Sequence, residues 1–401
     1  MSKSNPDTFL IKATLLLAST LTVMSGATIS PSLPAMQAHF SGVQNVDFWV
    51  RLVLTVPALL VVISSPIAGQ IVDKLGRKPL LIAATVLYGV AGVSGFFLDS
   101  LFLILAGRAF LGVAVAGIMV SATTLIADYY KGDDRASFMG LQGAFTGFGG
   151  VLFLSLGGFL ADQSWRWPFL IYVSSLLLLP TIVESLFEPQ RSDNNSSANK
   201  QNEETTSLPI KLLVLIYGAG LIAQIAFYLI PVQLPFYLEA LTGANASRSG
   251  LAIAFSTLFT AIASLSYGKI KQKLSFIKVL GLAFILMGVG YVGLSFASNY
   301  WWVLLTLIPA GIGLGLMIPN LNVWTSAEVD NAVRGRALGG VTTFTFLGQF
   351  LSPIISQPAN AQLGLATVYG LAGIILLVLG AIAWSSRKQI CKLVEASAGH
   401  S

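Results

Sequence analysis

The stretch Gly69-Gln-Ile-Val-Asp73-Lys-Leu-Gly76-Arg77-Lys78-Pro-Leu-Leu81 decides the fold of this chain. An apolar run ends near Gly69, charged and turn-forming residues fill 73–79, and a second apolar run begins at Leu80. A connection this short forces the two apolar runs into an antiparallel hairpin. We expect Gly69 and Gly76 to supply turn geometry and close approach, because glycine adopts conformations that other residues avoid.

The composition places these apolar runs in a membrane. Of the 401 residues, 55% are hydrophobic and only 10% are charged, and the mean hydropathy is +0.78. A soluble protein could not cover so much apolar surface. Because a helix needs about 20 apolar residues to cross the hydrocarbon, the length accommodates twelve helices and their loops. We therefore predict an all-α membrane protein with twelve transmembrane helices.

The apolar segments can be placed along the chain one by one. We expect helices at 13–30, 49–70, 80–98, 101–127, 137–161 and 167–187, and then at 209–238, 249–268, 278–297, 301–325, 337–357 and 363–385. The first segment could instead belong to a signal peptide, with Ser25-Gly26-Ala27 as the cleavage site. Its apolar run is longer than the about 7–15 residues typical of signal peptides, so we interpret it as a membrane helix.

A single long polar run divides the chain almost at its midpoint. Its composition from Glu188 to Ser207 fits a flexible linker, so we predict an N-terminal six-helix bundle at 1–187, a cytoplasmic linker at 188–207 and a C-terminal six-helix bundle with a short tail at 208–401. The charged segment that begins at Asp128 is echoed by one that begins at Glu328. Parallel six-helix repeats are a known transporter construction, and we expect two pseudo-symmetric bundles.

The basic residues indicate how the chain lies in the membrane. If both termini are cytoplasmic, the 23 Lys and Arg residues fall on or near the cytoplasmic side, except Arg51, Arg166, Arg248 and the intrahelical Arg108. The opposite orientation contradicts the positive-inside rule. We therefore predict a multi-pass protein of the cytoplasmic (inner) membrane with both termini cytoplasmic. The net charge of +6 then reflects the lipid bilayer, and we expect no nucleic-acid partner.

Metal and redox chemistry have little to build on in this sequence. The single cysteine, Cys391, can form no internal disulfide, and the only two histidines, His39 and His400, are far apart. We expect no metal and no cofactor. A membrane-embedded enzyme would need clustered His, Asp or Glu within its helices, and no such cluster is present, so we expect no enzymatic activity.

The loop motif resembles that of a known family. The residues Gly69, Asp73, Gly76, Arg77 and Lys78 match G-x-x-x-D-x-x-G-R-K at every position, and this resembles the helix 2–3 loop of the major facilitator superfamily. The resemblance implies a transporter whose loop is a conformational latch. The alternative is that these charges only set the topology.

The same resemblance implies partners for two of the motif's charges. Asp73 would accept hydrogen bonds near the start of helix 11, at about 337–340, where the helix dipole favours an anion. Arg77 would pair with Asp128 at the end of helix 4. This latch would hold the two halves together in the outward-facing state and break when the transporter turns inward.

An arginine stands inside the fourth predicted helix. A charged residue well inside the bilayer costs at least about 2.5–3.5 kcal/mol, so Arg108 should face the protein interior or a wet cavity. Alternatively, it snorkels to the periplasmic surface, about two turns away at Ser100. Its surroundings resemble the family's helix 4 motif R-x-x-Q-G, with Gly112 as the glycine and Leu111 in place of the glutamine. The resemblance implies a role for Arg108 in proton coupling.

Two further stretches resemble exporters of the family, and in helix 5 the resemblance weakens. Residues 30–36 resemble the end of helix 1, and residues 165–169 resemble the segment that follows helix 5. Antiporters carry G-x-x-x-G-P-x-x-G-G in helix 5. Here Gly149 and the pair at 157–158 match, but Phe153-Leu154 replaces Gly-Pro. Helix 5 glycines alone are typical of packing contacts.

No carboxylate lies mid-membrane in helix 1, where some proton-coupled drug exporters of this family have one. The central cavity should therefore be lined by neutral polar and aromatic groups. The candidates are Met24, Gln142, Gln224, Tyr228, Gln233, Asn320, Asn322, Trp324 and Gln349. An amide inside a helix bundle needs partners, so each is either an interhelical hydrogen bond or a ligand contact. The set implies an amphipathic or weakly polar substrate.

These features together predict a secondary active transporter. We expect proton-coupled efflux of small amphipathic or drug-like compounds by alternating access, with the protein acting as a monomer. The alternative is an uptake symporter or uniporter for a small metabolite, which the missing Gly-Pro and the missing helix 1 carboxylate favour.

Overall fold

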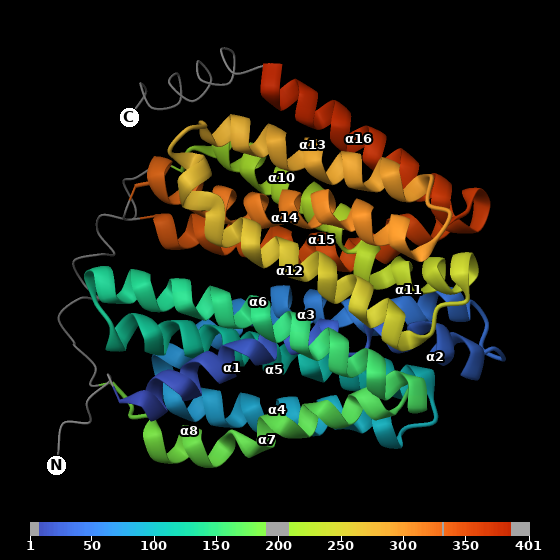
Figure 1. Cartoon of the computed structure of the whole chain (residues 1–401). Helices are drawn as coiled ribbons and strands as arrows, with labels where there is room; N and C mark the ends of the chain where they lie inside the picture. Colours follow the sequence, from blue (N-terminus) through green and yellow to red (C-terminus); the bar gives the residue numbers. More distant parts are fainter. Residues whose placement is uncertain (1–7, 190–207, 331–332, 386–401) are drawn as a thin grey trace. The chain divides into compact units, whose positions relative to one another are not determined.

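The computed structural model describes residues 8–189, 208–330 and 333–385, and these residues form helices joined by short connections (Figure 1). The first half contains α1 (Phe9–Ala27), η1 (Ser30–Ser32), α2 (Leu33–His39), α3 (Val46–Leu75), α4 (Arg77–Phe97), α5 (Leu101–Tyr129), α6 (Gly132–Gln163), η2 (Trp167–Val173), α7 (Ser174–Leu177) and α8 (Leu179–Ser185). The second half contains α10 (Ile210–Phe227), α11 (Leu229–Thr242), α12 (Ala246–Lys271), α13 (Phe276–Ser295), α14 (Tyr300–Glu328), α15 (Arg334–Leu363) and α16 (Leu365–Ser385).

The described residues contain 12 helical stretches that are long and apolar enough to cross a membrane. Each corresponds to one of the twelve predicted segments, so the predicted all-α membrane fold is confirmed. The bounds move by a few residues at most ends, because charged and turn-forming residues continue the helices beyond the apolar runs.

Three of these stretches are interrupted rather than continuous. The first stops as α1 at Ala27, passes through η1, and resumes as α2 beyond Pro31 and Pro34. The sixth runs as η2, α7 and α8. The seventh, predicted as one helix at 209–238, divides into α10 and α11 around Tyr228. Pro231 contributes to that division, because a proline cannot donate the backbone hydrogen bond of a continuous helix.

The described chain packs as two compact units that do not follow the sequence midpoint. Most of the first half, within Met1–Gln190, is joined by Ile230–Thr257, which comprises most of α11 and the first part of α12. The other unit lies within Arg191–Leu229 and Leu258–Ser401. The predicted division at 1–187, 188–207 and 208–401 stays a prediction, and most of its linker lies outside the described residues.

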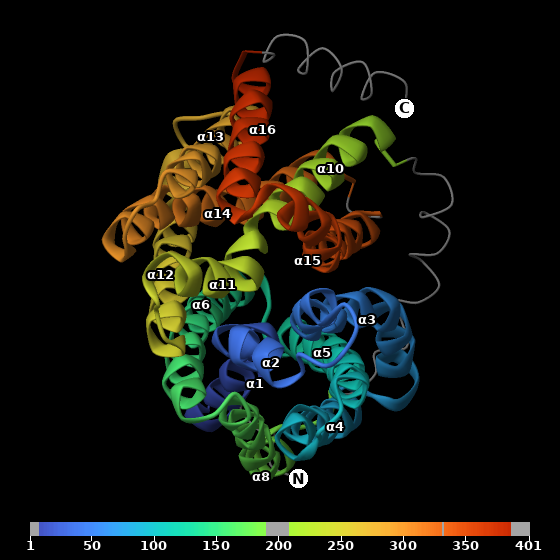
Figure 2. The same cartoon turned by 90° about the vertical axis from the view of Figure 1, so that its right-hand side faces the viewer.

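Glycines let helices of each unit approach backbone to backbone. In the first unit, a Cβ on Gly112 of α5 would collide with the Pro57 carbonyl of α3. In the second, α13 and α16 run alongside each other (Figures 1 and 2), and a Cβ on Gly288 would lie 2.8 Å from the Gly373 carbonyl oxygen. Small residues at such interfaces are typical of membrane proteins, where close packing is the main association force between helices.

Candidate functional site

The connection between α3 and α4 is a single residue. α3 ends at Leu75, α4 begins at Arg77, and Gly76 between them has a φ of 100°. This is the turn expected at Gly76, where a side chain would be strained. Gly69 lies inside α3, so the turn expected there is not formed, and the close approach expected at Gly69 stays a prediction.

The basic residues that follow this turn are held by two other helices. Arg77 Nε lies 2.9 Å from Asp128 Oδ2, at the end of α5, which is the ion pair expected from the sequence. Lys78 Nζ donates to the carbonyl oxygens of Val183 and Leu186, at 2.7 and 2.6 Å, at the end of α8. The pair is partly exposed, so it contributes at most about 1 kcal/mol of stability by itself. Its role as part of a latch stays a prediction.

Glu188 completes this group, although its sequence context predicts only that it belongs to the linker. Its carboxylate accepts hydrogen bonds from the backbone N–H groups of Arg77 and Lys78, each at 2.8 Å. These are the first N–H groups of α4, which have no partner inside the helix and favour an anion. An acidic residue at the start of a polar run was the available signal. We call Gly76, Arg77, Lys78, Asp128 and Glu188 the Gly76 junction.

Asp73 lies exposed in the last turns of α3. Its expected partner, the start of helix 11 near 337–340, lies in the other compact unit. That contact stays a prediction.

Arg108 is buried, with 1% of its surface exposed, and its guanidinium points into the first unit. Nε donates to the Val53 carbonyl of α3 at 3.0 Å, and Nη1 donates to the Tyr172 hydroxyl of η2 at 2.8 Å. Nη2 donates to the Ser25 carbonyl of α1. Among the described residues, no carboxylate pairs with it. We call Arg108, Val53, Tyr172 and Ser25 the arginine clamp.

Helix breaks in the sequence explain why these carbonyls are free. The Val53 carbonyl would normally accept from residue 57, but Pro57 has no N–H. The Ser25 carbonyl belongs to the last turn of α1, whose carbonyls have no partner within the helix. Gly112, one turn after Arg108, brings α5 directly onto Pro57. The snorkelling alternative is therefore wrong, because Arg108 satisfies carbonyls inside the bundle.

The glycine pair at 157–158 of α6 makes packing contacts, as the sequence suggested. A Cβ on Gly157 would collide with the Thr28 carbonyl, and one on Gly158 would lie 2.8 Å from the Ala246 carbonyl oxygen of α12. α6 runs helically through Phe153 and Leu154, where antiporters of the family carry Gly-Pro.

A second polar group lies at the end of α3 opposite Gly76. The side chain of Arg51 is 3% exposed, and its Nε donates to Gln233 Oε1 of α11 at 2.8 Å. Its Nη1 donates to Gln37 Oε1 at 3.0 Å and to the Asp47 carbonyl at 2.6 Å. The guanidinium also lies 3.9 Å from the centre of the Phe236 ring. The sequence alone indicates only that Arg51 is an external charge, because its partners come from segments distant in the chain.

Asp162, at the end of α6, caps α12 in the same region. Its carboxylate accepts from Asn245 Nδ2 at 2.9 Å and from the Ser247 backbone N–H at 3.1 Å, and also from the Ser247 hydroxyl. We call the Arg51–Gln233 and Asp162–Asn245–Ser247 hydrogen bonds the cross-half contacts. They join the first half of the sequence to its second half within one compact unit.

Four of the predicted cavity residues have buried side chains. Met24, Gln233 and Asn320 are 0% exposed and Trp324 is 2% exposed, and their role as substrate contacts stays a prediction. Asn320 Nδ2 donates to the Phe276 carbonyl at 3.0 Å, and Trp324 stacks on the Phe276 ring. These contacts fill the interior because polar and aromatic groups inside a membrane bundle need partners.

The remaining predicted cavity residues occupy varied positions. Gln142 Nε2 donates to Ser19 Oγ at 2.8 Å and so links α6 to α1. Tyr228 lies at the break between α10 and α11, Gln349 is half-buried in α15, and Asn322 is exposed. Gln224 is 5% exposed, and its Oε1 is a buried acceptor without a hydrogen-bond partner among the described residues.

Metal chemistry has no structural support in the described part of the chain. It contains no group of three or more His, Cys, Asp or Glu residues able to hold a metal ion. The described side chains therefore offer hydrogen bonding and ion pairing at the Gly76 junction, the arginine clamp and the cross-half contacts.

Comparison with known proteins gives a consistent result. Residues 15–233 and 216–392 match the profile of the Major Facilitator Superfamily. The chain is similar to the bacillibactin exporter of Bacillus subtilis (strain 168), with 27% identity over 345 residues that cover 82% of this chain and 85% of that protein. It is also similar to the quinolone resistance protein NorA of Staphylococcus aureus (strain COL), with 25% identity over 333 residues, 80% of this chain and 84% of that protein.

Solved structures agree at the level of the fold. A D-xylose-proton symporter superimposes with a TM-score of 0.77 and 18% identity over 94% of this chain and 97% of that one. An inward-facing, unoccupied bacterial homologue of the human lysosomal transporter Spinster also gives 0.77, with 16% identity over 99% of each chain. The family and these relatives are transporters rather than enzymes.

Proposed function

Because this chain belongs to the Major Facilitator Superfamily and is a multi-pass membrane transporter, we propose that it exports small amphipathic or drug-like compounds in exchange for protons. The observation that carries the proton-coupling part is the arginine clamp. A buried guanidinium without a carboxylate partner is costly in a membrane, and its retention is explained by a functional role.

The direction of transport is proposed from the relatives. Both curated relatives bear names of export or resistance, and each aligns with at least 80% of this chain. The small number of charges inside the described helices supports an amphipathic or weakly polar substrate, since a multiply charged one would need buried partners.

The proposed role of Arg108 in proton coupling is supported by its hydrogen bonds to three other segments of the first half. The clamp connects α5 to α1, α3 and η2 through hydrogen bonds to Ser25, Val53 and Tyr172. An arginine has five N–H donors, and three of them are engaged. A change in the position or hydration of this guanidinium therefore affects four segments of the bundle at once.

Alternating access requires contacts that form at one end of the helices and break at the other. If both termini are cytoplasmic, as the distribution of Lys and Arg favours, the Gly76 junction is cytoplasmic and the cross-half contacts are extracellular. Opening toward the outside would then require the hydrogen bonds of Arg51 and Asp162 to break. We further propose a monomer in the cytoplasmic membrane, with six-helix bundles at 1–187 and 208–401 as its moving halves.

The uninterrupted α6 favours a second function. Antiporters of the family carry Gly-Pro where this chain has Phe153 and Leu154, and α6 continues through both. An uptake symporter or uniporter for a small metabolite fits that departure.

The deciding experiment measures efflux of a lipophilic fluorescent dye from cells expressing the protein, with and without a protonophore. We expect protonophore-sensitive efflux that is slowed in Asp73→Asn, because that variant removes an anion of the loop motif but should insert normally. Asp99→Asn is the control, since Asp99 pairs with Arg166 near the opposite end of the helices. Absence of efflux by a well-expressed protein would favour the uptake alternative.

A further inference from the structure

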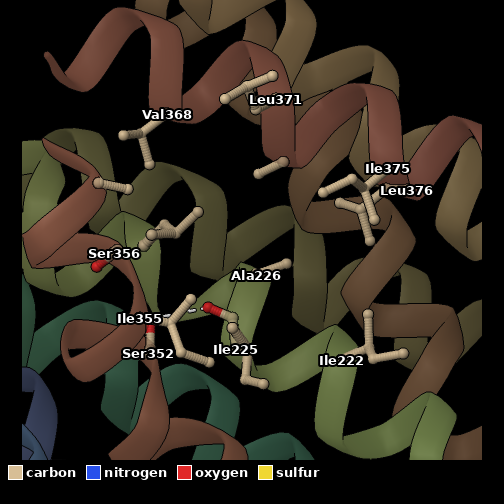
Figure 3. A pocket seen from close by; sticks show the side chains of 13 residues that line it. Ile222, Ile225, Ala226, Ser352, Ile355, Ser356, Val368, Leu371, Ile375 and Leu376 are labelled. Carbon is tan, nitrogen blue, oxygen red and sulfur yellow. Dashed lines mark hydrogen bonds between the residues drawn. The ribbon is translucent and has the colours of Figure 1, made fainter. Parts of the chain in front are cut away.

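A cavity of about 330 Å³ lies among α10, α15 and α16. Figure 3 shows residues of α10 below the cavity, residues of α16 above it and residues of α15 at its left; the labelled side chains are Ile222, Ile225 and Ala226 of α10, Ser352, Ile355 and Ser356 of α15, and Leu371, Ile375 and Leu376 of α16. None of the cavity residues predicted from the sequence lines it. All its lining residues belong to one compact unit.

The packing of α16 explains why this space is open. Its glycines face α13, where a Cβ on Gly373 would lie 2.6 Å from the Val292 nitrogen and one on Gly380 2.9 Å from the Gly281 oxygen. The larger side chains of α16 therefore point elsewhere, among them Leu371. α15 is held against α10, where a Cβ on Gly348 would lie 2.6 Å from the Leu221 oxygen. Each helix packs closely on a different neighbour, and a wedge of space is left between α15 and α16.

The wall of the cavity offers no free hydrogen-bonding group. Eleven of the thirteen lining side chains are aliphatic, and the other two are serines. Ser352 Oγ donates to the Ile225 carbonyl at 2.8 Å, the dashed bond of Figure 3, and Ser356 is also engaged. An ion or a polar molecule would lose its hydration here without replacement, so the wall of the cavity suits a hydrocarbon.

Three lining residues of the cavity are exposed side chains that we expect to face the membrane. Ile355, Leu371 and Ile375 line the cavity and are 54%, 46% and 57% exposed, on helices that are long and apolar enough to cross the bilayer. The medium around such side chains is lipid acyl chain. The side chains around an empty apolar cavity lack dispersion contacts on that side. Here an acyl chain of the surrounding lipid can enter the cavity from the lateral surface of the helices.

We propose that this cavity is a binding site for one acyl chain of a membrane phospholipid. Its volume is about eleven times the roughly 30 Å³ of a liquid water molecule, and a methylene group is of similar size, so roughly ten methylenes of one chain fit. The chain fills the wedge between α15 and α16 and packs on Leu229 beside the α10–α11 break. This site is separate from the transport function proposed above and does not depend on its direction.

The test uses the full-length protein reconstituted in vesicles of phosphatidylcholine that carries a photoreactive diazirine near the end of one acyl chain. After illumination, labelled peptides are mapped by mass spectrometry. We expect the label to concentrate on 352–359 and 368–376. Ala372→Trp, which places an indole in the cavity, should lower the label there at least about fivefold, because a packed interior admits no second occupant.

Val378→Trp is the matched control. Val378 lies on the exposed face of α16 outside the cavity and is 52% exposed, so its labelling pattern should equal that of the wild type. If Ala372→Trp does not fold, Ala359→Phe blocks the cavity from α15 instead. Label spread evenly over all helices, or unchanged by both cavity variants, would overturn the proposal. Loss of label on adding the lipophilic dye would show that the cavity takes transported compounds, and would equally overturn it.

Discussion

Each half of the chain contains an interrupted membrane-spanning helix, and at each interruption two buried tyrosines donate hydrogen bonds to backbone carbonyls. In the first half, α1 ends inside its membrane-spanning segment and leaves carbonyl groups without helical partners. The Tyr172 hydroxyl donates to the Ser25 carbonyl of this last turn at 2.9 Å, and the Tyr88 hydroxyl donates to the Leu21 carbonyl, one turn earlier in α1, at 2.7 Å. The two tyrosine rings have their centroids 5.6 Å apart.

The second half repeats this arrangement at the break between α10 and α11. Tyr291 donates to the Ala226 carbonyl at 2.6 Å, and Tyr369 donates to the Leu229 carbonyl at 3.0 Å. The ring centroids are 5.9 Å apart. The pairs come from corresponding helices, α4 with η2 and α13 with α16. Tyrosine suits this position because its ring packs while its hydroxyl donates.

The difference is the arginine. Gly112 packs on Pro57 in the first half, and Gly315 packs on Thr260 in the second. By this correspondence, the position of Arg108 is taken by Gly311, whose carbonyl accepts a hydrogen bond from Thr260 at 3.0 Å. The tyrosines are thus sufficient to stabilise a broken helix. The charge that only the first half carries requires a different explanation, which the proposed proton coupling supplies.

The largest expected effect comes from removing that charge. Arg108→Ala should lower transport driven by an imposed pH gradient on the order of a hundredfold, which corresponds to about 3 kcal/mol on the barrier. The first half would then resemble the second, so the protein should still fold. Uptake of dye into inside-out vesicles, measured across a series of external pH values, tests this. A wild-type pH response in Arg108→Ala would contradict the proton-coupling role.

A pair of matched variants separates the structural role from the functional one. Tyr172→Phe and Tyr369→Phe each remove a hydroxyl that binds a helix-break carbonyl, and each should cost about 1–3 kcal/mol of stability. Only Tyr172 also binds Arg108, so only its variant should slow transport, by roughly tenfold for about 1.4 kcal/mol. Melting temperatures in detergent and transport rates in vesicles are the two measurements. Equal transport loss in both variants would refute the asymmetry.

The sequence predicted the elements that depend on local pattern. The twelve apolar stretches predicted the membrane-spanning helices, and Gly76 predicted the turn between α3 and α4. The family motif also predicted the ion pair between Arg77 and Asp128, which the structure contains. Each follows from residues near one another in the chain or from a resemblance in a short motif.

The hydrogen-bond partners of the polar side chains could not be predicted, because they depend on contacts between segments that are distant in the sequence. No periodicity distinguishes a buried Gln233 that binds Arg51 from one that faces a cavity, because both lie on an apolar helix. Glu188 was hidden by its place in a polar run, although it caps α4. One signal was available and missed: buried tyrosines must donate a hydrogen bond, and Tyr88 and Tyr291 recur at corresponding places in the two halves.

We expect a smaller effect from weakening the hydrogen bonds between Asp162 and the start of α12, which belong to the cross-half contacts. The corresponding helices α3 and α12 differ here, because the start of α12 is capped by Asp162 of α6. Asp162→Asn removes the anion and at least one acceptor, which weakens the cap by about 1 kcal/mol. We expect a Ser249→Cys probe, buried at 2% exposure, to react about fivefold faster with a membrane-impermeant maleimide in that variant.

The labelling experiment needs a background without the native thiol. Cys391, which lies outside the described residues, is the only cysteine of the chain, so Cys391→Ser provides that background. Asp99→Asn is again the control, since Asp99 pairs with Arg166, whereas the cap of α12 is made by Asp162. If the probe reacts equally in both variants, the cross-half contacts do not hold this end closed.

The smallest expected effect tests the break in the second half. Gln224, in the last turn of α10, has a buried Oε1 without a partner among the described residues, whereas the first-half break has no such acceptor on α1. An unpaired buried acceptor costs about 1–3 kcal/mol, so Gln224→Met, of similar length, should raise the melting temperature by about 2–4 °C. Gln142→Met is the control and should lower it, because Gln142 binds Ser19. A lower melting temperature in Gln224→Met would mean that a water or a bound molecule satisfies this oxygen in the membrane, which would be consistent with Gln224 as a substrate contact.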